Sequence, residues 1–69
     1  MNEKQTAKAL WVMAQNNITD YQFDGKELSF QFTDISIFGD VIKTYVLKPI
    51  SDNAIGSFVD GECRNEWVA

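Results

Sequence analysis

The 69-residue sequence contains no histidine, a single cysteine and a single proline. Acid–base catalysis near neutral pH most often uses histidine, so the commonest catalytic acid or base is missing. Cys63 has no second cysteine for an internal disulfide, and one cysteine without histidine does not make a zinc site. These absences predict a protein that is not an enzyme, binds no cofactor or metal, and resides in a reducing, cytoplasmic compartment.

Basic residues and long apolar runs are also scarce. Six Lys or Arg stand against ten Asp or Glu, for a formal net charge of −4, and no two basic residues are adjacent. A phosphate backbone needs a basic patch, and a signal peptide or membrane span needs a longer apolar run. We therefore expect no direct nucleic-acid binding and no membrane association. The acidity suits a basic partner, or alternatively only keeps a small domain soluble.

Aromatic residues are plentiful at 13%, and 45% of the chain is hydrophobic. This composition predicts one small globular domain over residues 1–69. A chain this short buries only about 60% of its unfolded surface, so it needs efficient packing or a partner.

Residues 3–16 have the pattern of an amphipathic helix. Asn2 fits the N-cap position, and Gln5 three residues later completes a capping box. Apolar side chains recur with the i, i+3, i+4, i+7 spacing of one helical face, which we expect to enter the core with Trp11 as its largest member: Ala7, Leu10, Trp11, Met13 and Ala14.

Residues 18–33, ITDYQFDGKELSFQFT, predict a β-hairpin, because two alternating runs flank Asp24-Gly25. A four-residue loop from Asp24 to Glu27 places apolar residues opposite each other: Phe23 with Leu28, Tyr21 with Phe30, and Thr19 with Phe32. The aromatic stripe could stack nucleic-acid bases, but its neighbours are acidic. We therefore expect it to lie in the core beneath the helix.

The alternation breaks at Thr33-Asp34, where Ile35 and Ile37 change parity relative to Phe32, so we expect a bulge or turn there. A second turn is expected at 38–40. Residues 41–48 are the most strand-like segment, and Pro49 is expected to end it. Both faces of this strand are partly apolar. One face is expected to lie under the helix, and the other could be covered by another molecule.

Residues 52–68 allow two interpretations. The spacing of apolar residues slightly favours a short helix over 52–60, capped by Ser51. Alternatively, 54–59 is a strand that turns at Asp60-Gly61 into a second hairpin. The predicted fold is therefore α+β, with an N-terminal helix on an antiparallel sheet of three to four strands (hairpin 18–33, strand 41–48) and a short second helix or second hairpin at 52–68.

Acidic residues gather from Asp52 onward in the C-terminal third, a stretch in which Arg64 is the only basic side chain. An acidic rim around aromatic residues is a plausible interface, since Trp and Tyr dominate binding energy and charge guides encounter. The candidate partner-binding residues are Asp52, Asp60, Glu62, Glu66, Trp67 and Tyr45. The alternative is a solvated acidic face with Trp67 closing the core.

The leading hypothesis is a small acidic protein–protein interaction module that occupies the surface of a larger, basic partner. By analogy of size and charge alone, it could be a phage or mobile-element inhibitor of a nucleic-acid-handling enzyme. The second hypothesis is a structural homodimer or accessory subunit that pairs through strand 41–48. An enzyme built on two carboxylates is the weakest hypothesis, because five aspartates fall in or beside predicted turns, where such side chains bond their own backbone: Asp20, Asp24, Asp34, Asp40 and Asp60.

Overall fold

The structure is a computed structural model that describes all residues from 1 to 69. One helix precedes five strands: α1 (Glu3–Gln15), β1 (Gln22–Phe23), β2 (Leu28–Ser36), β3 (Gly39–Ser51), β4 (Ala54–Val59) and β5 (Glu62–Val68). The strands form one antiparallel sheet in the order β1-β2-β3-β4-β5. The α+β class is confirmed, but the sheet has five strands, not three to four.

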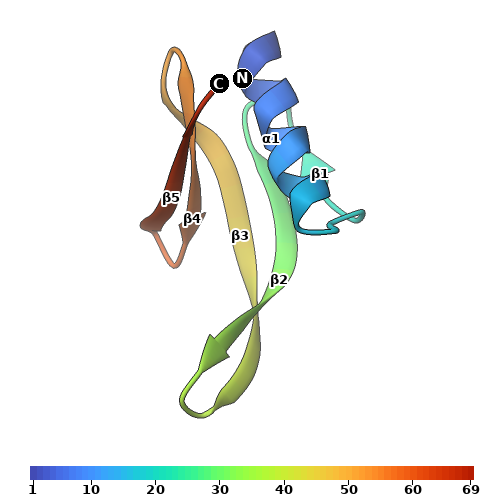
Figure 1. Ribbon diagram of the computed structural model, residues 1–69, viewed down its shortest axis with the longest axis vertical. Coiled ribbons are helices and arrows are strands. Elements are labelled where there is room, and N and C mark those ends of the chain that lie inside the picture. The colour runs from blue at the N-terminus through green and yellow to red at the C-terminus, as the bar shows by residue number, and fades with distance from the viewer.

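α1 covers one end of the sheet, and the β2–β3 hairpin continues well beyond it (Figure 1). Helix and sheet share a small core of seven buried residues: Ala9, Val12, Met13, Leu28, Phe30, Leu47 and Ile55. α1 has neither the length nor the apolar composition that a membrane-spanning helix needs.

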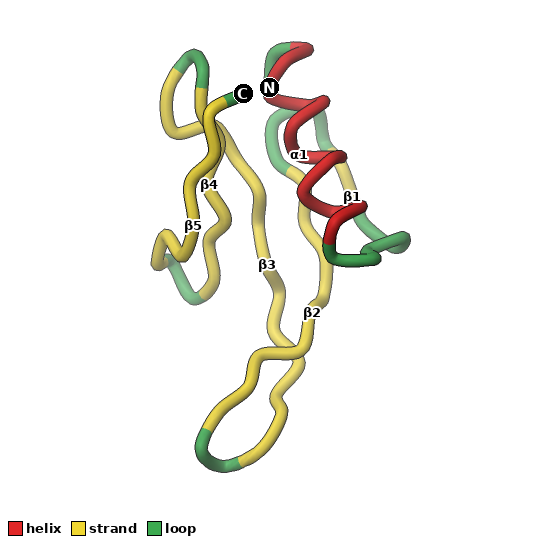
Figure 2. Tube along the Cα trace, viewed as in Figure 1, coloured by secondary structure: helices red, strands yellow, loops and turns green.

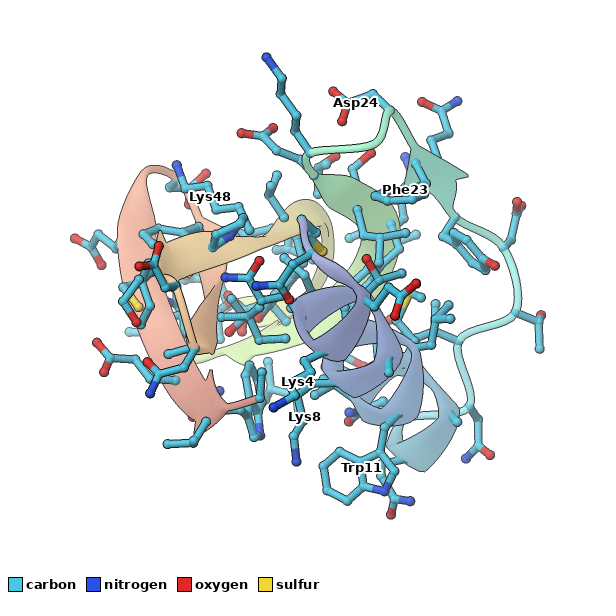
Figure 3. All side chains as sticks on the ribbon, turned by 90° about the horizontal axis from the view of Figure 1, so that it is seen from above. Lys4, Lys8, Trp11, Phe23, Asp24 and Lys48 are labelled. Carbon is cyan, nitrogen blue, oxygen red and sulfur yellow. The ribbon has the colours of Figure 1, made fainter.

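The predicted start of α1 is confirmed, but only Met13 of the predicted buried face is buried. The Asn2 side chain accepts a hydrogen bond from the Gln5 backbone at 2.8 Å, and the Gln5 side chain accepts one from the Asn2 backbone at 2.9 Å. The buried residues of the helix are Gln5, Ala9, Val12 and Met13. Trp11, expected in the core, is 50% exposed and lies on the outer side of α1 (Figure 3).

Hydrogen bonds made by Gln5 explain why this face turns inward. Its amide nitrogen donates to the carbonyl oxygens of Ser51, at 2.6 Å, and Ala54, at 3.4 Å. A buried amide that is paired in this way avoids most of its desolvation penalty. The Lys8 ammonium lies over the Trp11 ring, 4.6 Å from its centroid. A polar residue therefore occupies the buried face, and the large aromatic residue lies outside.

The first hairpin is shorter than predicted. Phe23 pairs with Leu28 across the Asp24–Glu27 loop, as expected, but β1 contains only two residues. Tyr21 lies outside the ladder, so the predicted pair with Phe30 does not form. Phe30 pairs instead with Tyr45 of β3, and their rings stack with centroids 5.9 Å apart.

β2 and β3 pair without interruption from Leu28–Leu47 to Ser36–Gly39, so the expected bulge at Thr33-Asp34 is wrong. The connecting turn is made by residues 37–38, one residue earlier than the predicted 38–40. The change of parity in the sequence marks the place where large apolar residues move to the face of the ribbon that points away from α1.

Pro49 does not end β3, which continues to Ser51. Beyond Leu47, β3 no longer pairs with β2. One edge of β3 therefore has no neighbouring strand there, and the missing backbone N–H of Pro49 breaks no hydrogen bond on that edge. The ladder with β4 shifts register between Pro49 and Ser51.

The C-terminal segment is a hairpin, so the slightly favoured helix over 52–60 is wrong and the alternative is confirmed. Asp60 and Gly61 both have positive φ, at 54° and 79°, as the tight turns of two-residue hairpins require. Ile55 and Val59 face the core, with 0% and 1% exposure. Strand pairing therefore overrides the helical spacing of the apolar residues.

Candidate interaction surface

Residues 33–42, here called the arm, form the far end of the β2–β3 hairpin. β1 pairs only with Leu28 and Ser29, and β4 pairs only with residues from Val46 onward, so the two strands of the arm have only each other (Figure 2). Three large apolar side chains are almost fully exposed there: Ile35 at 84%, Ile37 at 93% and Phe38 at 93%. Such a cluster marks a candidate contact surface.

The tip of the arm is held by its own hydrogen bonds. The Ser36 hydroxyl donates to the Gly39 carbonyl oxygen at 2.7 Å and accepts from the Phe38 amide at 3.2 Å. Gly39 has a φ of 111°, which a residue with a Cβ rarely adopts. The turn is therefore shaped without the side chains of Ile37 and Phe38, which remain available for other contacts.

The sheet face that points away from α1, here called the outer face, has no element packed on it. Its side chains include Ile42 at 68% exposure and, farther along, Ile50 and Phe58. The Lys48 ammonium lies 4.3 Å from the centroid of the Phe58 ring. Gly56 has no Cβ, and neighbouring side chains occupy the space that one would need. A Cβ at this position would lie 3.1 Å from Cys63 Sγ and 3.2 Å from Ile50 Cγ2.

Two ion pairs connect the base of the arm to the β4–β5 hairpin. Lys43 Nζ donates to Asp60 Oδ2 at 2.5 Å, and Arg64 lies 3.6 Å from Asp34. The hydrogen bond from Lys43 lowers the pKa of the Asp60 carboxyl, and the same bond raises the pKa of Lys43. The Asp60 side chain is 66% exposed and that of Lys43 is 32% exposed, so solvent screens the pair, which orients the turn more than it stabilises the fold.

The predicted site residues do not form one patch. Asp60 and Glu62 lie at the turn beside the base of the arm, whereas Asp52 lies in the turn at the other end of β4. Glu66 lies on β5, where it pairs with Gly56 of β4. The two aromatic residues, Tyr45 and Trp67, are half-buried and pack against the core on the α1 side.

Sequence reasoning missed Ile35, Ile37 and Phe38, which are the most exposed large apolar residues. The signal was present in the change of parity after Phe32. This change is typical of a bulge or turn, but an uninterrupted strand with apolar residues on both faces produces the same pattern.

A groove of about 170 Å³ lies between the end of α1 and the sheet, lined in part by Val12, Phe30 and Trp67. The Ser57 hydroxyl on its wall is buried and makes no hydrogen bond. Sites for small molecules usually have about 300–1,000 Å³, so this groove holds one ring-sized group at most. No three His, Cys, Asp or Glu side chains lie together as a metal site would require.

Comparison with protein-family models, curated protein sequences and solved structures finds no match to this chain. The function is therefore inferred from the arm, the outer face and the charges beside them.

Proposed function

We propose that this chain is a small acidic, non-catalytic interaction module that occupies the surface of a larger, basic protein through the arm. The observation that carries the proposal is the exposure of Ile35, Ile37 and Phe38, between 84% and 93%. Burying one such side chain stabilises a complex by about 1.5–3 kcal/mol. The arm therefore holds apolar surface that the fold itself does not use.

Acidic side chains on and beside the arm support a basic partner. Asp34 and Asp60 are paired with basic side chains, but Asp40 and Glu62 form no ion pair. Together with the net charge of −4, they would attract a positively charged surface and speed association. A nucleic-acid-handling enzyme has such a surface, because it binds phosphates. The acidity and small size of the chain support a role as an inhibitor of such an enzyme.

The test begins with a photo-crosslinking residue at position 38, expressed in the native host, and identifies the captured protein by mass spectrometry. Titration of the purified partner with Ile37→Ser/Phe38→Ser is expected to show affinity weakened about tenfold or more, with the melting temperature nearly unchanged. Leu10→Ser/Trp11→Ser removes two apolar side chains that are 43% and 50% exposed on α1, and it is the control for loss of exposed apolar surface outside the arm. Glu62→Lys should weaken binding less, and only at low salt. Unaltered affinity in the arm variant would overturn the proposal.

A second candidate function is a structural homodimer or accessory subunit that pairs through strand 41–48. The observation in its favour is the uncovered outer face of β3, where Ile42 is 68% exposed. Sedimentation of the purified protein tests it, since a strict monomer at tens of micromolar excludes self-association of functional strength.

A further inference from the structure

The outward side chains of β3 form a symmetric series about Thr44. The odd-numbered residues Tyr45 and Leu47 face the core. By the alternation of a strand, the even-numbered residues therefore face away from α1, and Figure 3 shows Lys48 on the far side of the sheet from the helix. In order they are an acid, an apolar residue, a polar residue, an apolar residue and a base: Asp40, Ile42, Thr44, Val46 and Lys48.

Read backward, this series has the same apolar positions and the opposite charges. In a two-fold symmetric contact centred on Thr44, residue 44 + n of one copy faces residue 44 − n of the other. Ile42 then faces Val46 of the second copy, and Asp40 faces Lys48. Each of these two contacts occurs twice, and Thr44 of one copy faces Thr44 of the other.

We propose that two copies of this chain pack through the outer faces of their β2–β3 ribbons, with the two-fold axis between the sheets, across the strands and through Thr44. This inference rests on the second candidate function and names its surface and register. The face is the part of β3 that is free for such a contact. Pairing through the strand edge about Thr44 is blocked, because β4 occupies the edge from Val46 onward.

The two charges of the series are available for contact between copies. Neither Asp40 nor Lys48 takes part in an ion pair within the chain. Lys48 is held over the Phe58 ring, which keeps its ammonium on the outer face. Aligned sheets pack about 10 Å apart, a distance that a lysine and an aspartate side chain span together.

The size of the surface sets the expected strength. The series and its flanks cover two strands over roughly twelve residues, or about 400 Å² of flat sheet per copy. Two copies together then bury about 800 Å², which is below the roughly 1,200–2,000 Å² of stable specific interfaces and in the range of weak and transient complexes. We therefore expect a concentration-dependent dimer with a dissociation constant in the micromolar range.

Sedimentation velocity between about 1 and 200 μM tests the register with charge exchanges. Asp40→Lys and Lys48→Asp each place like charges opposite each other twice, and each is expected to weaken the dimer about tenfold or more. Asp40→Lys/Lys48→Asp exchanges the charges and should restore the wild-type constant within about threefold. The control Glu3→Lys/Lys4→Asp makes the same exchange on the exposed side of α1 and should leave dimerisation unchanged. Circular dichroism confirms that each variant is folded.

Net charge alone predicts a different outcome. Asp40→Lys changes the net charge from −4 to −2, which reduces repulsion between copies, whereas Lys48→Asp raises its magnitude to 6. If Asp40→Lys strengthens the dimer, or if the double variant is as weak as the single variants, the register about Thr44 is wrong although dimerisation stands. A wild-type chain that stays monomeric at 200 μM overturns both the register and the second candidate function.

Discussion

The two halves of the β2–β3 hairpin use the same kinds of residue for opposite purposes. In the half under α1, Leu28 and Leu47 face each other across the ladder and are 0% exposed. In the arm, Ile37 and Phe38 are 93% exposed. The hydrogen-bond ladder is continuous between the halves. Apolar side chains therefore stabilise the fold only where another element covers the strand. Elsewhere they remain available for binding.

The covered half of the hairpin should also contribute more to the stability of the fold than the arm does. A two-stranded ribbon is marginal on its own in water. The arm keeps its form because its ladder continues from the covered half and because Ser36 closes its tip. Substitutions of equal size in the two halves should therefore differ strongly in their effect on folding.

The largest expected effect is that of Leu47→Ala, which should lower the free energy of unfolding by about 2–5 kcal/mol. Leu47 is fully buried between α1 and the sheet, and truncation leaves a cavity. Ile35→Ala, a comparable truncation in the arm, should change that free energy by less than about 0.5 kcal/mol. Urea denaturation at low micromolar protein concentration measures both. Equal losses would show that the arm is part of the folded core.

A smaller effect is expected for Gln5→Leu, about 1–3 kcal/mol. This change removes the half of the capping box that the Gln5 side chain makes, and it leaves the carbonyl oxygens of Ser51 and Ala54 without their side-chain donor. Gln15→Leu, at the exposed end of α1, is the matched control and should be nearly neutral. If the Gln5→Leu variant is as stable as wild type, burial of the helix face does not depend on Gln5.

Local signals predicted what local forces determine. The capping box of Asn2 and Gln5, the Asp24–Glu27 loop and the Phe23–Leu28 pair depend on residues close in sequence, and all are present. The buried face of α1 depends on distant partners. Two stripes of residues on α1 have helical spacing, and hydrophobicity alone favours the one that contains Leu10 and Trp11. Gln5 is buried because its amide meets carbonyls about fifty residues away, which no local pattern records.

The candidate surface was harder to predict for the same reason. The residue types of Trp67 and Tyr45 predict an interface, yet both pack against the core, Tyr45 from β3 and Trp67 from β5. Whether an apolar residue is covered depends on where α1 ends relative to the sheet. The sequence indicated correctly that strand 41–48 is apolar on both faces. It could not indicate that α1 covers only the end of the hairpin nearest the termini (Figure 1).

The smallest expected effect separates the two ends of β2 by their response to pH. At the covered end, Asp24 accepts hydrogen bonds from the backbone amides of Lys26 and Glu27, both at 2.8 Å, whereas the arm tip is closed by the neutral Ser36. The bonds from Glu27 and Lys26 lower the pKa of Asp24 below its usual 3.8. A lowered pKa means that folding favours the carboxylate, so its stabilisation is complete above about pH 3.8 and is lost as the pH falls through the folded-state value.

Asp24→Ala should therefore lower the melting temperature at neutral pH, and the difference from wild type should shrink as the pH falls below 3.8, down to the part that the neutral carboxyl still contributes as an acceptor. Asp24→Asn keeps an oxygen acceptor for the same amides but cannot ionise, so it should lose less at neutral pH and show a weaker pH dependence. Thermal melts from about pH 7 to about pH 2 measure the three curves. If the alanine and asparagine variants behave alike, charge rather than the two backbone hydrogen bonds stabilises the loop. Parallel curves at all pH values would remove ionisation of Asp24 from the account, and the two ends of β2 would then be held by neutral hydrogen bonds alike.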